Sequence, residues 1–121
     1  MRETKSYIIY KGKEYPIVFN LNVMEVIQDE YKSLEAWGKL TDGSNEQEVN
    51  IKALIFGLGA MLNEGIEINN DETGANEPLL THKQVGRILT EVGVKDTADT
   101  MNKLVINSTQ TDEDKEKAKN A

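Results

Sequence analysis

The chain has 121 residues, a formal net charge of -7 and no cysteine. This length suffices for one modest core and is too short for two, and the lack of cysteine excludes disulfides, thiolate metal sites and cysteine nucleophiles. No run of roughly 18 apolar residues is present, and the charged start Met1–Lys5 is not followed by an apolar signal stretch. We therefore expect a cytoplasmic, unprocessed protein that does not enter a membrane.

The negative charge is concentrated between Thr41 and Pro78, where eight acidic side chains stand against Lys52. Such a segment repels phosphate backbones, and the sequence has no compensating stripe of lysine and arginine that would release counterions from DNA or RNA. The charge pattern predicts that nucleic acid is not a partner.

Two β-rich runs lie on either side of Lys11-Gly12-Lys13 and predict a β-hairpin over residues 6–19. Pro16 cannot donate a ladder hydrogen bond, so its strand is expected to be an edge strand or to begin there. A lone hairpin is marginal in water, so this one must pack on the rest of the chain.

From Leu21 onward, apolar residues recur at spacings of three and four, which is typical of an amphipathic helix. The pattern predicts a helix over residues 22–34, with Asn20 or Asn22 as its N-cap. A further short turn could follow at Glu35–Leu40.

A capping box formed by Ser44 and Gln47 predicts a central helix over residues 46–63. Gly57 and Gly59 lie inside it, and each costs up to about 1 kcal/mol relative to alanine. We interpret them as positions where another backbone packs closely, in preference to a ligand contact. Without a preceding strand and a third glycine they do not make a dinucleotide fingerprint.

The polar run 69–78 predicts a mobile loop, because it has little apolar surface to bury. Thr81 and Gln84 form a second capping-box pattern, which predicts a helix over residues 82–92. Gly93 is expected to end that helix.

Asp96 or Thr97 is expected to cap a last helix over residues 97–106. The charged segment 109–121 has no large apolar residue and predicts a solvated, flexible tail. The whole pattern predicts a single α+β domain over residues 1–108, in which an N-terminal hairpin precedes about four helices.

Two sequence patterns could indicate metal binding or catalysis, but each is better explained by a purely structural role. The stretch 69–80 has oxygen ligands at several positions of a calcium loop, but Leu80 stands where the bidentate glutamate is required. His82 would lie in the first turn of a helix, whose dipole disfavours its charged form, and no partner stands at a relay spacing. We predict a protein that is not an enzyme and that has no catalytic residue, metal or cofactor.

Trp37, Met101 and Ile106 are candidate partner-binding residues. Tryptophan is enriched at interface hot spots, and Met101 and Ile106 lie near the end of the ordered region. The alternative, that all three side chains simply complete a small core, stays open.

Several short motifs in this order resemble those of one protein family. They are Lys11–Tyr15 in the hairpin turn, Phe19–Asn22 leading into Val26–Leu34, the helical segment Leu54–Leu58, and the stop Asn63–Gly65. This layout, over residues 5–106, is similar to that of the tail assembly chaperones of siphophages and prophages of Gram-positive bacteria. It departs from the family pattern at Lys32, where a glycine is common.

The resemblance implies a protein that binds the tape measure protein, keeps its helical apolar surface soluble and helps recruit tail tube subunits. It implies a location in the host cytoplasm, absence from the finished virion and, in many members, a longer frameshifted form to which the segment after Ser108 would be the linker. A homo-oligomer is compatible with this interpretation. The alternatives are a structural or head-tail joining component of a phage particle, or a small protein-binding regulator.

Overall fold

The computed structural model describes residues 1–42 and 48–120, with side chains as far as Thr109. The elements are β1 (Thr4–Tyr10), β2 (Lys13–Phe19), α1 (Leu21–Tyr31), α2 (Leu34–Thr41), α3 (Ile51–Thr73), α4 (His82–Val92) and α5 (Val94–Asn120). The predicted α+β class, with an N-terminal hairpin followed by helices, is confirmed. The described residues form five helices and not four, because the short turn expected after residue 34 is a helix of its own.

The hairpin is antiparallel, with a register that runs from Thr4 opposite Phe19 to Tyr10 opposite Lys13. Lys11 and Gly12 form the connection and both have positive φ, at 51° and 76°. A two-residue turn of this kind matches the right-handed twist of the strands. The hairpin predicted from the glycine-containing connection is therefore confirmed.

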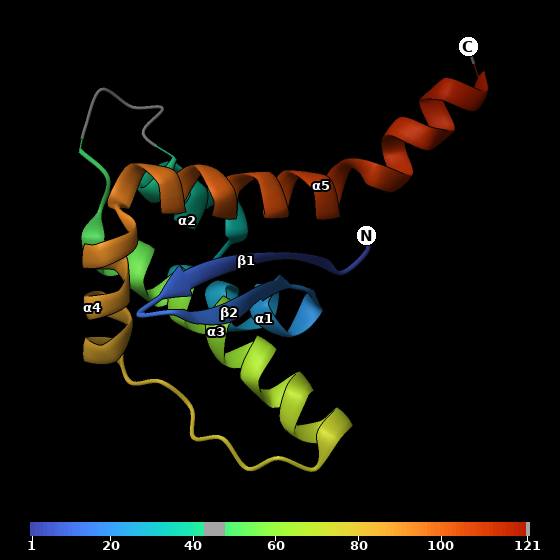
Figure 1. Cartoon of the computed structure of the whole chain (residues 1–121). Coiled ribbons are helices and arrows are strands. Elements are labelled where there is room, and N and C mark those ends of the chain that lie inside the picture. Colours follow the sequence, from blue (N-terminus) through green and yellow to red (C-terminus); the bar gives the residue numbers. More distant parts are fainter. Residues whose placement is uncertain (43–47, 121) are drawn as a thin grey trace.

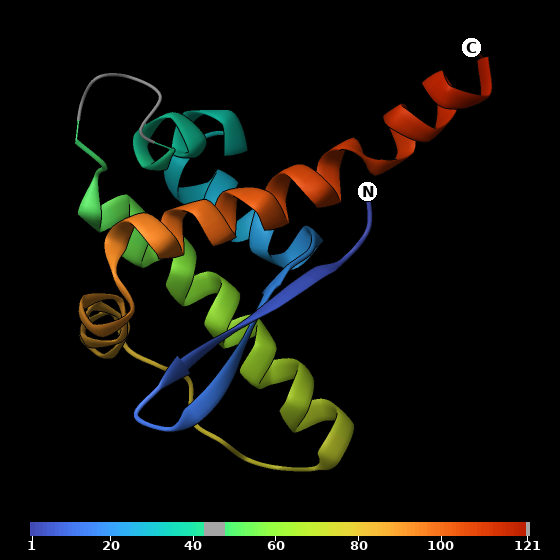
Figure 2. The same ribbon diagram turned by 45° about the horizontal axis from the view of Figure 1, so that its top comes forward.

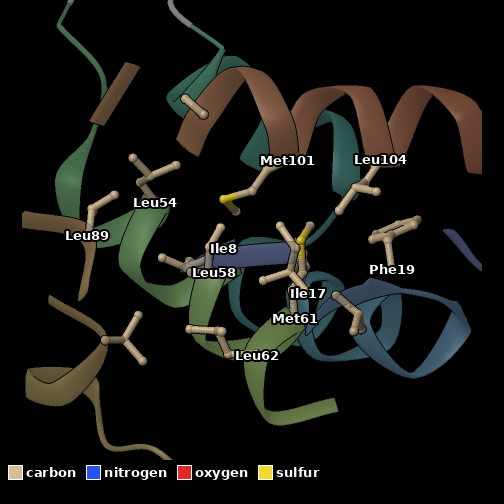
Figure 3. Close-up of a cluster of buried hydrophobic side chains, with 14 of the residues drawn as sticks. Ile8, Ile17, Phe19, Leu54, Leu58, Met61, Leu62, Leu89, Met101 and Leu104 are labelled. Atoms are coloured by element: carbon tan, nitrogen blue, oxygen red, sulfur yellow. The ribbon is translucent and has the colours of Figure 1, made fainter. Parts of the chain in front are cut away.

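The hairpin lies between α5, which crosses it beside β1, and α3, which crosses it beside β2 (Figures 1 and 2). Met101 and Leu104 point from α5 toward the strand residues, and Leu58 and Met61 reach the same cluster from α3 (Figure 3). The most deeply buried side chains in this core are those of Ile17, Phe19, Ile27, Leu54, Leu58, Met61 and Leu62. The two-stranded sheet is thus stabilised by helices on both sides, as an isolated hairpin requires.

The first helix, predicted over residues 22–34, ends early at Tyr31, and a second helix begins at Leu34. The Asn20 side chain accepts a hydrogen bond from the backbone N–H of Val23 (3.2 Å), which confirms Asn20 as the N-cap of α1. The chain then turns at Lys32, with φ of 73°, and the Ser33 hydroxyl accepts from the Ala36 N–H (3.0 Å) to cap α2. A second local cap therefore ends the first helix early.

The bounds predicted for the central helix are wrong at both ends. The N-cap of α3 is Asn50, whose side chain accepts from the Ala53 N–H (3.0 Å), and the predicted capping box of Ser44 and Gln47 lies outside the described residues. The helix continues to Thr73 and ends at Gly74 in the left-handed conformation. The first part of the predicted loop is thus helical.

Residues 74–81, which we name the strap, return the chain from α3 to α4. Asn70 donates to the Glu77 carbonyl (2.9 Å) and accepts from the Glu77 N–H (3.0 Å). Asn63 makes the same reciprocal pair with Leu80, at 3.1 and 2.8 Å. Lys13 in β2 also forms an ion pair with Glu77. The strap is therefore fixed to α3 and to the hairpin by side chains.

The capping box at the start of α4 is confirmed, because the Thr81 hydroxyl accepts from the Gln84 N–H while the Gln84 side chain accepts from the Thr81 N–H. Gly93 follows the last residue of α4 with a φ of 103°, as expected for a terminating glycine. The prediction that Asp96 or Thr97 caps the last helix is wrong, because α5 begins directly at Val94.

The segment predicted to be a tail belongs to α5, which continues as a helix to Asn120. The sequence there lacks large apolar residues but is rich in lysine, glutamate and alanine, which have high helix propensity. Nearer the domain, α5 is tied to the N-terminal strand. Ser108 donates its hydroxyl to the Arg2 carbonyl, the Arg2 N–H donates to the Ser108 carbonyl (3.3 Å), and the Thr4 hydroxyl donates to the Leu104 carbonyl (2.8 Å).

Over residues 1–42 and 48–120, no helix has an apolar stretch of the length that a bilayer crossing requires.

Candidate functional site

An apolar groove runs along α3, between α1 on one side and the start of α4 on the other. It consists of two adjoining hollows of about 230 Å³ each, which share Val26, Ala60 and Asn63. We name it the α3 groove. Its lining residues are Asn22, Val23 and Val26 from α1, Ile55, Phe56, Gly59, Ala60, Asn63, Glu64 and Glu67 from α3, and Leu80, His82 and Val85 from the strap and α4.

The floor of the α3 groove is low because its central residues are small. Gly59 has no side chain and Ala60 has one methyl group, and both are partly exposed. A Cβ atom added at Gly59 would lie 3.5 Å from Val85, which is an ordinary van der Waals distance. No steric conflict with a neighbour therefore accounts for Gly59, in contrast to the close backbone approach predicted for it.

Phe56 closes one end of the floor. Its ring meets the ring of Tyr31 edge to face, with centroids 5.5 Å apart and an interplanar angle of 73°. Burial, with a smaller contribution from the nearby Glu30 carboxylate, raises the pKa of the Tyr31 phenol above its ordinary value. The aromatic pair joins the end of α1 to α3.

Val26 forms the wall on the α1 side and has 43% of its surface exposed. Its neighbours Val23 and Ile27 are buried in the core, so α1 presents apolar side chains over more of its circumference than its contact with α3 uses. An apolar face of this kind is a common feature of surfaces that meet a partner.

The rim of the α3 groove is mainly acidic. Glu67 is exposed and lines it toward the end of α3, where Glu64 also lines it but has only 9% of its surface exposed. Asp29 and Glu30 are exposed on α1 one turn beyond Val26, on the same side of the helix. His82 lies at the other end, at the start of α4, and is exposed. The combination is an apolar floor with negative charge along its edges.

Two of the three predicted partner-binding residues lie in the core. Trp37 has 2% of its surface exposed and Met101 has 1%. The Trp37 indole N–H donates to the Ala53 carbonyl (2.9 Å), and its ring occupies the space that a side chain at residue 57 would need. In this structure both residues follow the alternative interpretation, that of core completion.

Ile106 is 43% exposed on α5 and does not line the α3 groove. The structure therefore does not bring the three predicted residues together in one surface.

Gly57 is indeed at a close approach, but to a side chain and not to a backbone. A Cβ atom there would lie 2.3 Å from the Trp37 ring. The close backbone approach in α3 occurs at Gly65, where a Cβ atom would lie 2.7 Å from the carbonyl oxygen of Pro16 in β2.

The sequence patterns weighed for metal binding and catalysis fall in separate places. Asn69, Asp71 and Thr73 are part of α3 and do not form a loop. Within the part of the chain that the structure describes, no group of three or more histidine or acidic side chains is arranged to hold a metal ion.

A second cleft of about 330 Å³ lies between the hairpin and the end of α3. Its lining carries both signs of charge, including Lys5, Glu14 and Glu72, and the Lys13–Glu77 ion pair stands at its edge. The hydrogen bond with Glu77 raises the pKa of the Lys13 ammonium above its ordinary value. Because it is polar and bridged by the strap, this cleft is less suited to an apolar partner than the α3 groove.

The sequence patterns did not indicate the α3 groove. One signal could have revealed it: in α3, apolar residues occur nearly all round the helix, from Leu54 and Leu58 on the core side to Ile55 and Phe56 on the groove side. A helix with apolar residues on every side needs more than one neighbour.

Comparison of the chain with protein-family models, with curated proteins and with solved structures finds no match in any of the three. What the α3 groove binds must therefore be inferred from its own residues.

Proposed function

We propose that this chain is a non-enzymatic phage tail assembly chaperone, which binds the tape measure protein and helps to recruit tail tube subunits. The order of sequence motifs over residues 5–106 suggests the family. The single structural observation that supports the proposal is the α3 groove, an apolar channel between helices with acidic edges.

The physical task of such a chaperone suits these features. A long helical client with an apolar face aggregates unless that face is covered, and a groove between helices covers it by helix-in-groove recognition. A net charge of -7 keeps the resulting complexes apart from one another. The protein would act in the host cytoplasm and be released before the virion is complete.

Co-expression with the tape measure and tail tube proteins of the same genome tests this function. The tape measure protein should become soluble and co-purify with the chain. Val26→Asn should reduce the amount captured by about tenfold, because it places a polar group in the wall of the α3 groove. Ile9→Asn is the matched control, because Ile9 is 69% exposed on β1, outside the α3 groove.

Absence of co-purification with either protein would sink the proposal. So would detection of the chain in purified mature particles by mass spectrometry, which would indicate a structural or head-tail joining component instead.

A further inference from the structure

We propose that the α3 groove binds a cationic amphipathic helix. Its apolar stripe lies against Val26, Phe56 and Ala60, and its basic side chains lie over the exposed carboxylates of Glu67, Asp29 and Glu30. Identifying this helix as a segment of the tape measure protein rests on the proposed function. The chemistry of the occupant does not, because it follows from the shape and charge of the α3 groove.

The length of the α3 groove suits a helix of a few turns. From Phe56 to Glu67 the floor follows α3 over twelve residues, which is about 16 Å at a rise of 1.5 Å per residue. A helix laid along this floor would present about three turns to it. Helices pack in this way when the side chains of one fill the groove between neighbouring ridges of the other.

The apolar surface calls for a partner with an apolar stripe. Val26 is 43% exposed, and Ile55, Phe56 and Leu80 are each partly exposed around the same channel. A docked helix with apolar residues at spacings of three and four would remove this surface from water.

The charge around the α3 groove determines which charge the partner helix should carry. Glu67 is exposed at one end, beside the mostly buried Glu64, and Asp29 and Glu30 are exposed on α1 toward the Phe56 end. Against them stand His82 at the far end and Lys52, one turn before Phe56 on α3. The excess of carboxylates favours a helix with lysine or arginine beside its apolar stripe and disfavours an acidic one.

The last part of α5 from a second copy is a poor occupant. The sequence of residues 109–121 contains two alanines and no larger apolar side chain, so it cannot fill the channel. This segment is therefore not the cationic helix that we propose, which we assign to another protein.

Two fluorescein-labelled synthetic helices of about 18 residues, long enough to span the channel, provide the test. They share one set of leucine and alanine positions, and their remaining positions are lysine in one peptide and glutamate in the other. Titration of the full chain, followed by fluorescence anisotropy, should show the lysine peptide binding at least about tenfold more tightly than the glutamate peptide.

Two pairs of variants locate the site. Val26→Asn should weaken binding of the lysine peptide by about tenfold, and Ile9→Asn should leave it unchanged. Asp29→Asn with Glu67→Gln, which neutralises two exposed carboxylates beside the α3 groove, should weaken it and make it less sensitive to salt. The charge-matched control is Glu91→Gln with Asp99→Asn, which neutralises two exposed carboxylates on α4 and α5. Circular dichroism verifies that each variant is folded.

Equal binding of the two peptides, or no binding of either, would overturn the inference. Equal loss from the groove variants and their controls would overturn it as well, because it would indicate only a general attraction of cations. If the lysine peptide binds as expected while the tape measure protein is not captured, the inference holds and the proposed function fails. If the tape measure protein is captured equally by Val26→Asn, the function holds and this location fails.

Discussion

Gly57 and Gly59 have different surroundings, although they are close together in the sequence. They are two residues apart in α3 and therefore point to opposite sides of the helix. Gly57 faces the Trp37 ring, which is held in place by its hydrogen bond to Ala53. Gly59 faces the α3 groove. On one side of α3, the absence of a side chain thus lets the Trp37 ring pack against the helix. On the other side, it deepens the α3 groove.

Replacement of each glycine by alanine should therefore change stability in opposite directions. Gly57→Ala should lower the free energy of unfolding by about 1–3 kcal/mol, because the rigid indole must move to admit the new methyl group. Gly59→Ala should raise it by about 0.5–1 kcal/mol, because alanine is the better helix former and meets no conflict. Urea denaturation measures both, and a loss of stability in Gly59→Ala would contradict this account of the α3 groove.

At the scale of elements, local sequence patterns predicted those boundaries that are set locally. The turn at Lys11-Gly12, the N-cap Asn20 and the capping box at Thr81 each depend on a few adjacent residues. The end of α3 and the extent of α5 were not predicted, because both segments are polar and lack the apolar periodicity from which helices were recognised. Asn70 meets Glu77 only because the strap returns along α3. The α3 groove likewise depends on how α1 and α4 flank α3, which periodicity within one helix does not reveal.

The strap depends on two asparagines that lie two helical turns apart on one face of α3. Asn63→Ala should leave the N–H and carbonyl groups of Leu80 without their partners and cost about 1–3 kcal/mol. The expected signature is faster hydrogen exchange at the Leu80 amide, with smaller changes in the core.

Asn69→Ala is the control for this variant, because Asn69 is exposed on the same helix. If the Leu80 amide exchanges equally fast in the two variants, the Asn63 side chain is not what holds the strap.

At the scale of the whole molecule, hydrogen bonds join the N-terminal segment of the chain to its last helix, α5. Ser108 is fully buried and bonds to Arg2, 106 residues away along the chain, and Thr4 bonds to Leu104. These contacts hold α5 across the hairpin, so that Met101 and Leu104 cover the strand residues of the core (Figure 3). Loss of these contacts would expose the core cluster from one side.

Ser108→Ala should lower the free energy of unfolding by about 1 kcal/mol, because the Arg2 carbonyl loses a hydrogen bond in a partly buried position. Thr109→Ala is the adjacent control, since the Thr109 hydroxyl bonds within its own helix and is exposed. Thermal unfolding of the two variants at matched concentration measures the difference. Equal midpoints would show that the contact between strand and helix adds nothing to stability.

The contact between Arg2 and Ser108 also orders events during synthesis of the chain. The hairpin leaves the ribosome before α5, whose residues cover Ile17 and Phe19. Contacts between such distant residues form late, because a long loop must close before they are gained. The nascent hairpin therefore remains incompletely covered until α5 has been synthesised, and only then can the native core be completed.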